Sequence, residues 1–158
     1  MSKKNRAGFT LIELLVVMVV LSVLATVAIP SFSRWYPNYR LRTAAREIYS
    51  TFQTARMAAI KTGNASTFGA VTFDTGNKTY MAFIDEDDNW VPNGTERILK
   101  QVTLPDDVDY NDITLASDRT RFNSRGLVTG GTGYVKLVND NGRTQKITVW
   151  TAGNIEID

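Results

Sequence analysis

A long apolar run near the N-terminus constrains what this chain can fold into. Residues 14–33 carry no charged side chain, and a helix of about 20 residues is long enough to cross a bilayer. Lys3, Lys4 and Arg6 precede the run, which predicts that the N-terminus stays in the cytoplasm. Glu13 stands at its start, where a carboxylate is costly in hydrocarbon and usually marks function. The sequence therefore predicts one membrane helix with a functional acid.

Two other interpretations of this run fit the sequence less well. A cleaved secretory signal needs a small-residue site after an apolar region of about 7–15 residues. The run is longer than that, and "ATVAIPSFS" offers only a poor site, with Pro30 close behind. A plain N-terminal anchor leaves Glu13 unexplained.

The composition excludes several kinds of chemistry. The chain has 158 residues, of which 43% are hydrophobic and 22% are charged, as is typical of a globular domain. It contains no cysteine and no histidine. Thiolate nucleophiles, disulfides, Cys/His zinc sites and Ser-His-Asp triads are therefore excluded. We expect no enzymatic activity, no catalytic residue and no cofactor.

A second helix pattern follows the apolar run. Pro30 and Pro37 can kink the helix, and a 3-4-4 spacing of apolar residues then predicts an amphipathic stretch over about 38–62. Gly63 and Asn64 supply a stop signal. The apolar stripe consists of Leu41, Ala44, Ala45, Ile48, Phe52, Ala55 and Ala59.

The pattern changes to a period of two from Ser66 onward, which is typical of strands. Residues 74–77 predict a hairpin loop, and Asn141-Gly142 is a strong type I′ turn signal. Expected strands are 66–73, 78–84, 97–104, 112–117, 120–124, 134–140, 144–150 and 155–158. The predicted fold class is α+β, with the long N-terminal helix packed on a C-terminal antiparallel β domain over 63–158.

The N-terminal segment resembles the signal of type IV pilins and type II secretion pseudopilins. A basic leader, "MSKKNRAG", is followed by "FTLIE" and the apolar helix. The resemblance implies that prepilin peptidase cleaves between Gly8 and Phe9 and that the new amine of Phe9 is methylated. It also implies that Glu13 faces the N-terminal amine of a neighbouring subunit in a filament. Because a buried charge is tolerated only when paired, this contact would select the axial register of assembly.

The C-terminal third resembles the GspH/FimT group of minor pilins and pseudopilins. The shared features here are Phe122 to Gly126, Gly133 to Leu137, Gly142, Ile147 to Val149 and Gly153 to Ile155. The resemblance implies a pilin-like fold and a structural subunit of a type II secretion pseudopilus or a type IV pilus. Its implied partners are prepilin peptidase, other pilins or pseudopilins, and the inner membrane.

The two resemblances together imply a domain order and a location. Residues 1–8 would be the prepilin leader, and residues 9–62 the long helix, with its transmembrane part at about 9–33. Residues 63–158 would form a periplasmic globular domain. The protein would be a single-pass inner-membrane protein with a cytoplasmic N-terminus, associated with a filament after assembly. The sequence does not say whether it serves secretion, a pilus or competence.

The acidic segment 85–96 places Asp85, Asp87, Asn89 and Glu96 at the offsets of a calcium-binding loop. The sixth position of such a loop should be glycine, and here it is Trp90. We therefore favour a solvated acidic hairpin tip with no metal site, and the sequence leaves open whether an ion binds there.

Basic residues are frequent near the C-terminus. They are Arg119, Arg121, Arg125, Lys136, Arg143 and Lys146. Some FimT-type members take part in DNA uptake, and cationic clusters bind phosphate without reading sequence. In those members arginines follow the last glycine turn, whereas this chain ends in "GNIEID". A DNA-binding minor pilin is thus a less favoured alternative, and an anchored periplasmic binding domain unrelated to filaments is another.

Overall fold

The computed structural model describes residues 9–158, except for the side chains of residues 27–34. The predicted leader, residues 1–8, lies outside this description. A long helix, α1 (Leu11–Thr62), is followed by strands and one short 3-10 helix, η1 (Ala116–Asp118). The strands are β1 (Phe68–Asp74), β2 (Thr79–Asp85), β3 (Ile98–Thr103), β4 (Val108–Ile113), β5 (Arg119–Phe122), β6 (Val128–Gly130), β7 (Gly133–Asn139), β8 (Thr144–Val149) and β9 (Ile155–Ile157).

The chain divides into two compact units, Met1–Tyr36 and Pro37–Asp158. In the first unit, α1 begins with a capping box. The backbone N–H of Thr10 donates to Glu13 Oε2 at 2.9 Å, and the backbone N–H of Glu13 donates to Thr10 Oγ1 at 3.3 Å. These reciprocal bonds satisfy two donors at the helix start. Pro30 lies inside α1, so it does not end the helix.

Among the residues that the structure describes, no helix is both long enough and apolar enough to span a membrane.

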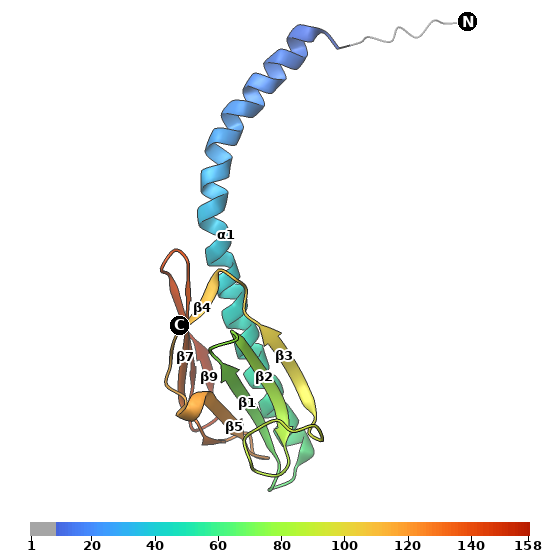
Figure 1. Ribbon diagram of the computed structural model, residues 1–158, viewed down its shortest axis with the longest axis vertical. Coiled ribbons are helices and arrows are strands. Elements are labelled where there is room, and N and C mark those ends of the chain that lie inside the picture. Colours follow the sequence, from blue (N-terminus) through green and yellow to red (C-terminus); the bar gives the residue numbers. More distant parts are fainter. Residues whose placement is uncertain (1–8) are drawn as a thin grey trace, which may run out of the picture. The chain divides into compact units, whose positions relative to one another are not determined.

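The second unit contains two antiparallel sheets. One has the strand order β3-β2-β1-β5-β6 and the other has the order β4-β7-β8-β9. β1 and β2 form a hairpin from Phe68 opposite Asp85 to Asp74 opposite Thr79. Figure 1 shows β1, β2 and β3 running alongside the C-terminal part of α1.

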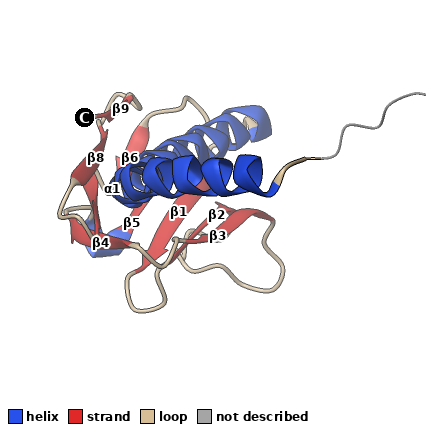
Figure 2. Cartoon of the chain, turned by 90° about the horizontal axis from the view of Figure 1, so that it is seen from above, coloured by secondary structure: helices blue, strands red, loops and turns tan. Residues whose placement is uncertain are grey.

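One hydrophobic core joins the helix and both sheets of this unit. Every residue of the predicted apolar stripe is buried. The core residues of the two sheets include Val71, Phe73 and Phe122 from one and Val135, Leu137 and Ile147 from the other. In Figure 2 the strands of both sheets lie next to the helix. The predicted α+β class, a helix packed on antiparallel strands, is confirmed.

β1 approaches the helix unusually closely at Gly69. A Cβ atom at this position would lie 2.7 Å from the carbonyl carbon of Ala55 and closer still to its oxygen. Only glycine lets the strand pack this near to the helix backbone.

One strand prediction was wrong, and one strand was missed. The expected strand over 112–117 is mostly absent, because β4 ends at Ile113 and η1 follows. Ser117 and Asp118 have φ values of 55° and 54°, so the backbone cannot stay extended there. β6 was missed because its three residues are too few to show a period of two.

Candidate functional site

The N-terminal end of the described chain presents the residues of the predicted assembly site. Phe9 is 91% exposed. The Glu13 carboxylate accepts hydrogen bonds from the backbone N–H and the hydroxyl of Thr10, both at Oε2 and both 2.9 Å long. Glu13 Oε1 takes part in neither of these two hydrogen bonds. Glu13 can therefore accept a hydrogen bond from another donor while it caps its own helix. Gly8 lies outside the described residues.

Apolar side chains are exposed on all sides of the helix beyond Glu13. They are Leu14, Leu15, Val16, Val17, Met18, Val19, Val20, Leu21, Val23 and Leu24, each at least half exposed. A helix that is apolar all round is normally buried in a membrane or among other helices. A hollow of about 330 Å³, lined by Phe9, Ile12, Glu13, Val16 and Val17, lies beside the carboxylate. Within the described residues of a single chain, this apolar surface is not covered by other side chains. Burying it would require a membrane or other helices.

The acidic segment is only partly the solvated hairpin tip that the sequence predicted, because Glu86, Asp87 and Asp88 are exposed while two other acids are buried. It forms the end of β2 and the loop before β3, but Asp85 is 0% exposed and Glu96 only 8% exposed. The buried Glu96 carboxylate accepts hydrogen bonds from backbone N–H groups of the loop. Its Oε1 accepts from the N–H of Glu86 and its Oε2 from the N–H of Asn93, both at 3.1 Å. Asn89 instead supports Asp87, donating from Nδ2 to Asp87 Oδ2 at 2.7 Å.

Arg121 on β5 contacts the loop between β2 and β3, residues 86–97, which we call the acidic loop. Its guanidinium carbon lies 4.1 Å from the ring centroid of Phe68 and 4.1 Å from that of Trp90, so the cation is held between two aromatic faces. Arg121 also pairs with Asp88 and lies 3.8 Å from Asp85 Oδ2. Sequence reasoning missed this arrangement because the partners come from separate strands and a loop.

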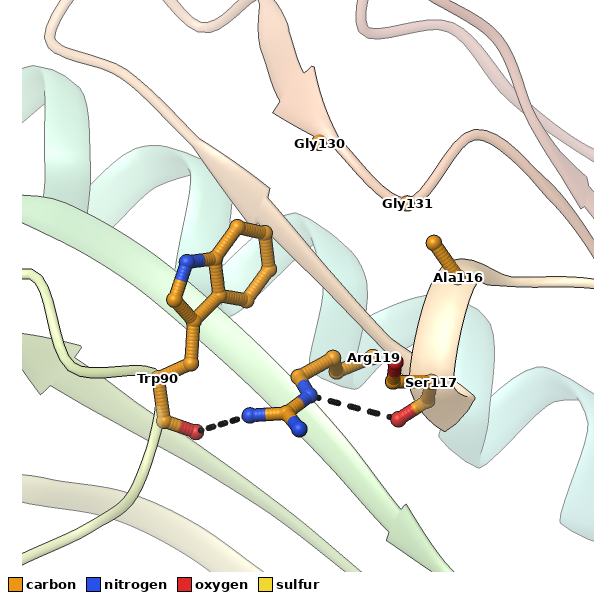
Figure 3. Close-up of a pocket in the computed structure, with 6 residues that line it drawn as sticks. All are labelled: Trp90, Ala116, Ser117, Arg119, Gly130 and Gly131. Carbon is orange, nitrogen blue, oxygen red and sulfur yellow. Dashed lines mark hydrogen bonds between the residues drawn. The ribbon is translucent and has the colours of Figure 1, made fainter.

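A pocket of about 320 Å³ lies beside this loop (Figure 3). It is lined by Trp90, Ala116, Ser117, Arg119, Gly130 and Gly131. The Arg119 guanidinium donates from Nη1 to the carbonyl of Trp90 and from Nε to that of Ser117, both at 3.3 Å. The indole of Trp90 packs against Gly130, where a Cβ would lie 2.6 Å from the ring. These contacts fix the loop and do not present an acid–base pair for catalysis.

Contacts at one end of the sheets tie β4 to the β1–β2 hairpin. The Tyr110 hydroxyl donates to the carbonyl of Thr79 at 3.2 Å, and burial raises the pKa of Tyr110. Lys78 Nζ lies 2.8 Å from Asp109 Oδ2. The hydrogen bond between them raises the pKa of Lys78 and lowers the pKa of Asp109. These polar links join the two sheets beyond their shared core.

Several residues of the predicted basic segment have partners within the chain. Arg119 and Arg121 are engaged by the acidic loop, as described above. Lys146 pairs with Asp158 at 3.0 Å, and it lies opposite Lys136 in the pairing of β7 with β8. Arg125 and Arg143 are exposed. Three of the six basic residues that could bind DNA thus have partners within the chain, which leaves fewer of them available to contact phosphate.

Duplex DNA is therefore expected to bind the full chain weakly, with an apparent dissociation constant of about 10⁻⁵ M or higher at physiological salt. Fluorescence anisotropy at two salt concentrations measures this. Arg143→Ala and Lys146→Ala remove candidate contacts, and Lys61→Ala removes one positive charge elsewhere. Submicromolar binding that Arg143→Ala or Lys146→Ala abolishes, but Lys61→Ala does not, would establish the DNA-uptake alternative.

Two family models match the chain. The "Prokaryotic N-terminal methylation motif" matches residues 3–29, and "Type II transport protein GspH" matches residues 44–153. Two curated relatives, each named "Fimbrial protein" and from Pseudomonas aeruginosa, are 35% identical over 72 residues. Each match covers 46% of this chain and 46% of the relative, so it spans less than half the length of either.

Two solved structures share the fold. Both are described as the minor pseudopilin EpsH from the type 2 secretion system of Vibrio cholerae. One has a TM-score of 0.57 at 16% identity and covers 75% of this chain and 96% of that chain. The other has a TM-score of 0.54 at 15% identity, with coverages of 75% and 92%.

Proposed function

The chain belongs to the family of the type II transport protein GspH, and we propose that it is a minor subunit of a type II secretion pseudopilus or a related type IV filament. This family consists of structural pseudopilins, and the family prediction from sequence is confirmed. The observation that carries the proposal is the match to GspH over residues 44–153 in a chain that also carries the methylation motif at residues 3–29.

The proposed subunit is inserted in the inner membrane by residues 9–33, with a cytoplasmic N-terminus and a periplasmic globular domain. The basic residues before an uncharged run support this orientation. Prepilin peptidase removes residues 1–8, and the amine of Phe9 is methylated. The exposed apolar helix surface then packs against the helices of other pilins or pseudopilins in the filament.

Glu13 is proposed to select the register of this packing. Its Oε2 is used by Thr10, and Oε1 is available to the terminal amine of a neighbouring subunit. That amine exists only after cleavage, so processing creates the partner of the carboxylate. Pairing offsets the cost of burying both charges, whereas a shifted register would leave both of them alone in an apolar surrounding.

Processing supplies the direct test of this proposal. When the chain is expressed with prepilin peptidase, mass spectrometry of the membrane fraction is expected to find a methylated Phe9 at the N-terminus. Cells that lack the peptidase provide the control, in which Met1 or Ser2 should remain at the terminus. A terminus near Ser31, or an unprocessed chain in the presence of the peptidase, would contradict the proposed role.

A further inference from the structure

Three carboxylates converge where β2 enters the acidic loop. Asp85, Asp87 and Glu96 each offer an oxygen, and the three oxygens lie within 4.8 Å of one another. Calcium binds oxygen at about 2.3–2.6 Å, so two ligands of one ion lie up to about 5 Å apart. The spacing of the carboxylates therefore allows all three to contact a single ion.

The buried member of this cluster lacks a full set of partners. Asp85 is 0% exposed. Its Oδ2 accepts a long hydrogen bond of 3.3 Å from the N–H of Trp90 and lies 3.8 Å from Arg121 Nη1. Its Oδ1 has no hydrogen-bond partner among the described residues. A buried carboxylate oxygen without a partner costs free energy, and a bound cation would remove that cost.

Arg121 does not fill this role. It approaches Asp85 from the Oδ2 side, and it is already paired with Asp88 and enclosed by Phe68 and Trp90. The nearby positive charge also lowers the local excess of negative charge, so the site should hold an ion with modest affinity.

We propose that Asp85, Asp87 and Glu96 bind a calcium ion. All three ligands are hard carboxylate oxygens, which suit calcium or magnesium rather than a transition metal. Asp87 and Glu96 come from a loop in which Asp88 and Trp90 have positive φ, and calcium accepts irregular coordination where magnesium demands an octahedron. Asp87 is exposed and gives the ion a path from solvent. The site does not depend on filament assembly.

Calcium titration of the full chain in detergent tests the proposal. After treatment with EGTA, the protein is titrated with calcium chloride by isothermal titration calorimetry, and thermal unfolding is followed in parallel. One ion should bind per chain, with a dissociation constant of about 10⁻⁴–10⁻³ M, the range of extracellular calcium modules. At ten times that concentration the melting midpoint should rise by about 3–5 °C.

Matched variants distinguish specific calcium binding at these three carboxylates from general electrostatic attraction of calcium to the acidic loop. Asp87→Asn should weaken binding at least about tenfold, because it removes one charged ligand from an exposed position where folding is not at risk. Glu86→Gln removes the same charge from the same loop but no ligand, and its affinity should stay within about twofold of wild type. Asp85→Asn should abolish the calcium-dependent rise of the melting midpoint.

The proposal is overturned if calcium at about 10 mM gives neither heat nor a shift of the melting midpoint, since that exceeds the expected range. It is also overturned if Glu86→Gln and Asp87→Asn weaken binding equally, or if magnesium reproduces the full shift. If Asp85→Asn does not fold, the comparison of Asp87→Asn with Glu86→Gln decides the outcome.

Discussion

Glu13→Gln is expected to be cleaved like the wild type but to enter filaments at least about tenfold less efficiently. Glutamine can replace glutamate in a capping box, so the helix start that Thr10 and residue 13 share should survive. The negative charge is lost, so in the proposed filament the terminal amine of the neighbouring subunit would be buried without its partner. Cleavage and incorporation into purified filaments are scored separately for each variant.

Two further variants divide capping from pairing. Thr10→Ala removes the cap and keeps the carboxylate, and it should cost about 1 kcal/mol of helix stability but still assemble. Glu13→Ala removes the carboxylate and its hydrogen bonds to Thr10, keeps the bond from the N–H of residue 13 to Thr10 Oγ1, and should fail to assemble. If Glu13→Gln assembles like the wild type while Thr10→Ala does not, the role of Glu13 is to cap its own helix. Normal assembly of Glu13→Ala would refute the pairing altogether.

Gly69→Ala is expected to destabilise the globular unit by about 3 kcal/mol or more. The new methyl group would overlap the carbonyl of Ala55, and neither β1 nor the helix can move without opening the shared core. Denaturant unfolding of the full chain, followed by circular dichroism, gives the change in the free energy of unfolding.

Gly94→Ala is the matched control for this substitution. A Cβ at Gly94 meets nothing within 4 Å, so the free energy of unfolding should change by no more than about 0.5 kcal/mol. Equal stability of the two variants would show that β1 does not approach the helix as closely as the structure places it.

The amphipathic helix was predictable because its signal is long and regular. Every residue of the stripe from Leu41 to Ala59 is buried, as the 3-4-4 spacing indicates. β4 was placed too late in the chain, since only its first and last residues, Val108 and Ile113, are aliphatic. Its position depends on pairing with β7, which no local pattern reveals.

The candidate sites were predictable to different degrees. Glu13 was selected as a carboxylate at the start of an apolar run, and Phe9 was selected by resemblance to a family. The capping role of Thr10 could have been inferred from the spacing of Thr10 and Glu13. The burial of Asp85 and Glu96 could not be predicted from the sequence, because it depends on backbone donors of the loop and on Arg121 from β5. Local sequence showed the acids but not what encloses them.

The shared core also determines how the globular unit would respond to force. In the proposed filament, tension would pull on each subunit along its helix. The stripe from Leu41 to Ala59 shares one core with both sheets, so a pull along α1 would act on both sheets at once. Extracting the helix would require many buried contacts to break together. Mechanical resistance in this fold would therefore come from the same helix that, in the proposed assembly, connects the subunit to the filament.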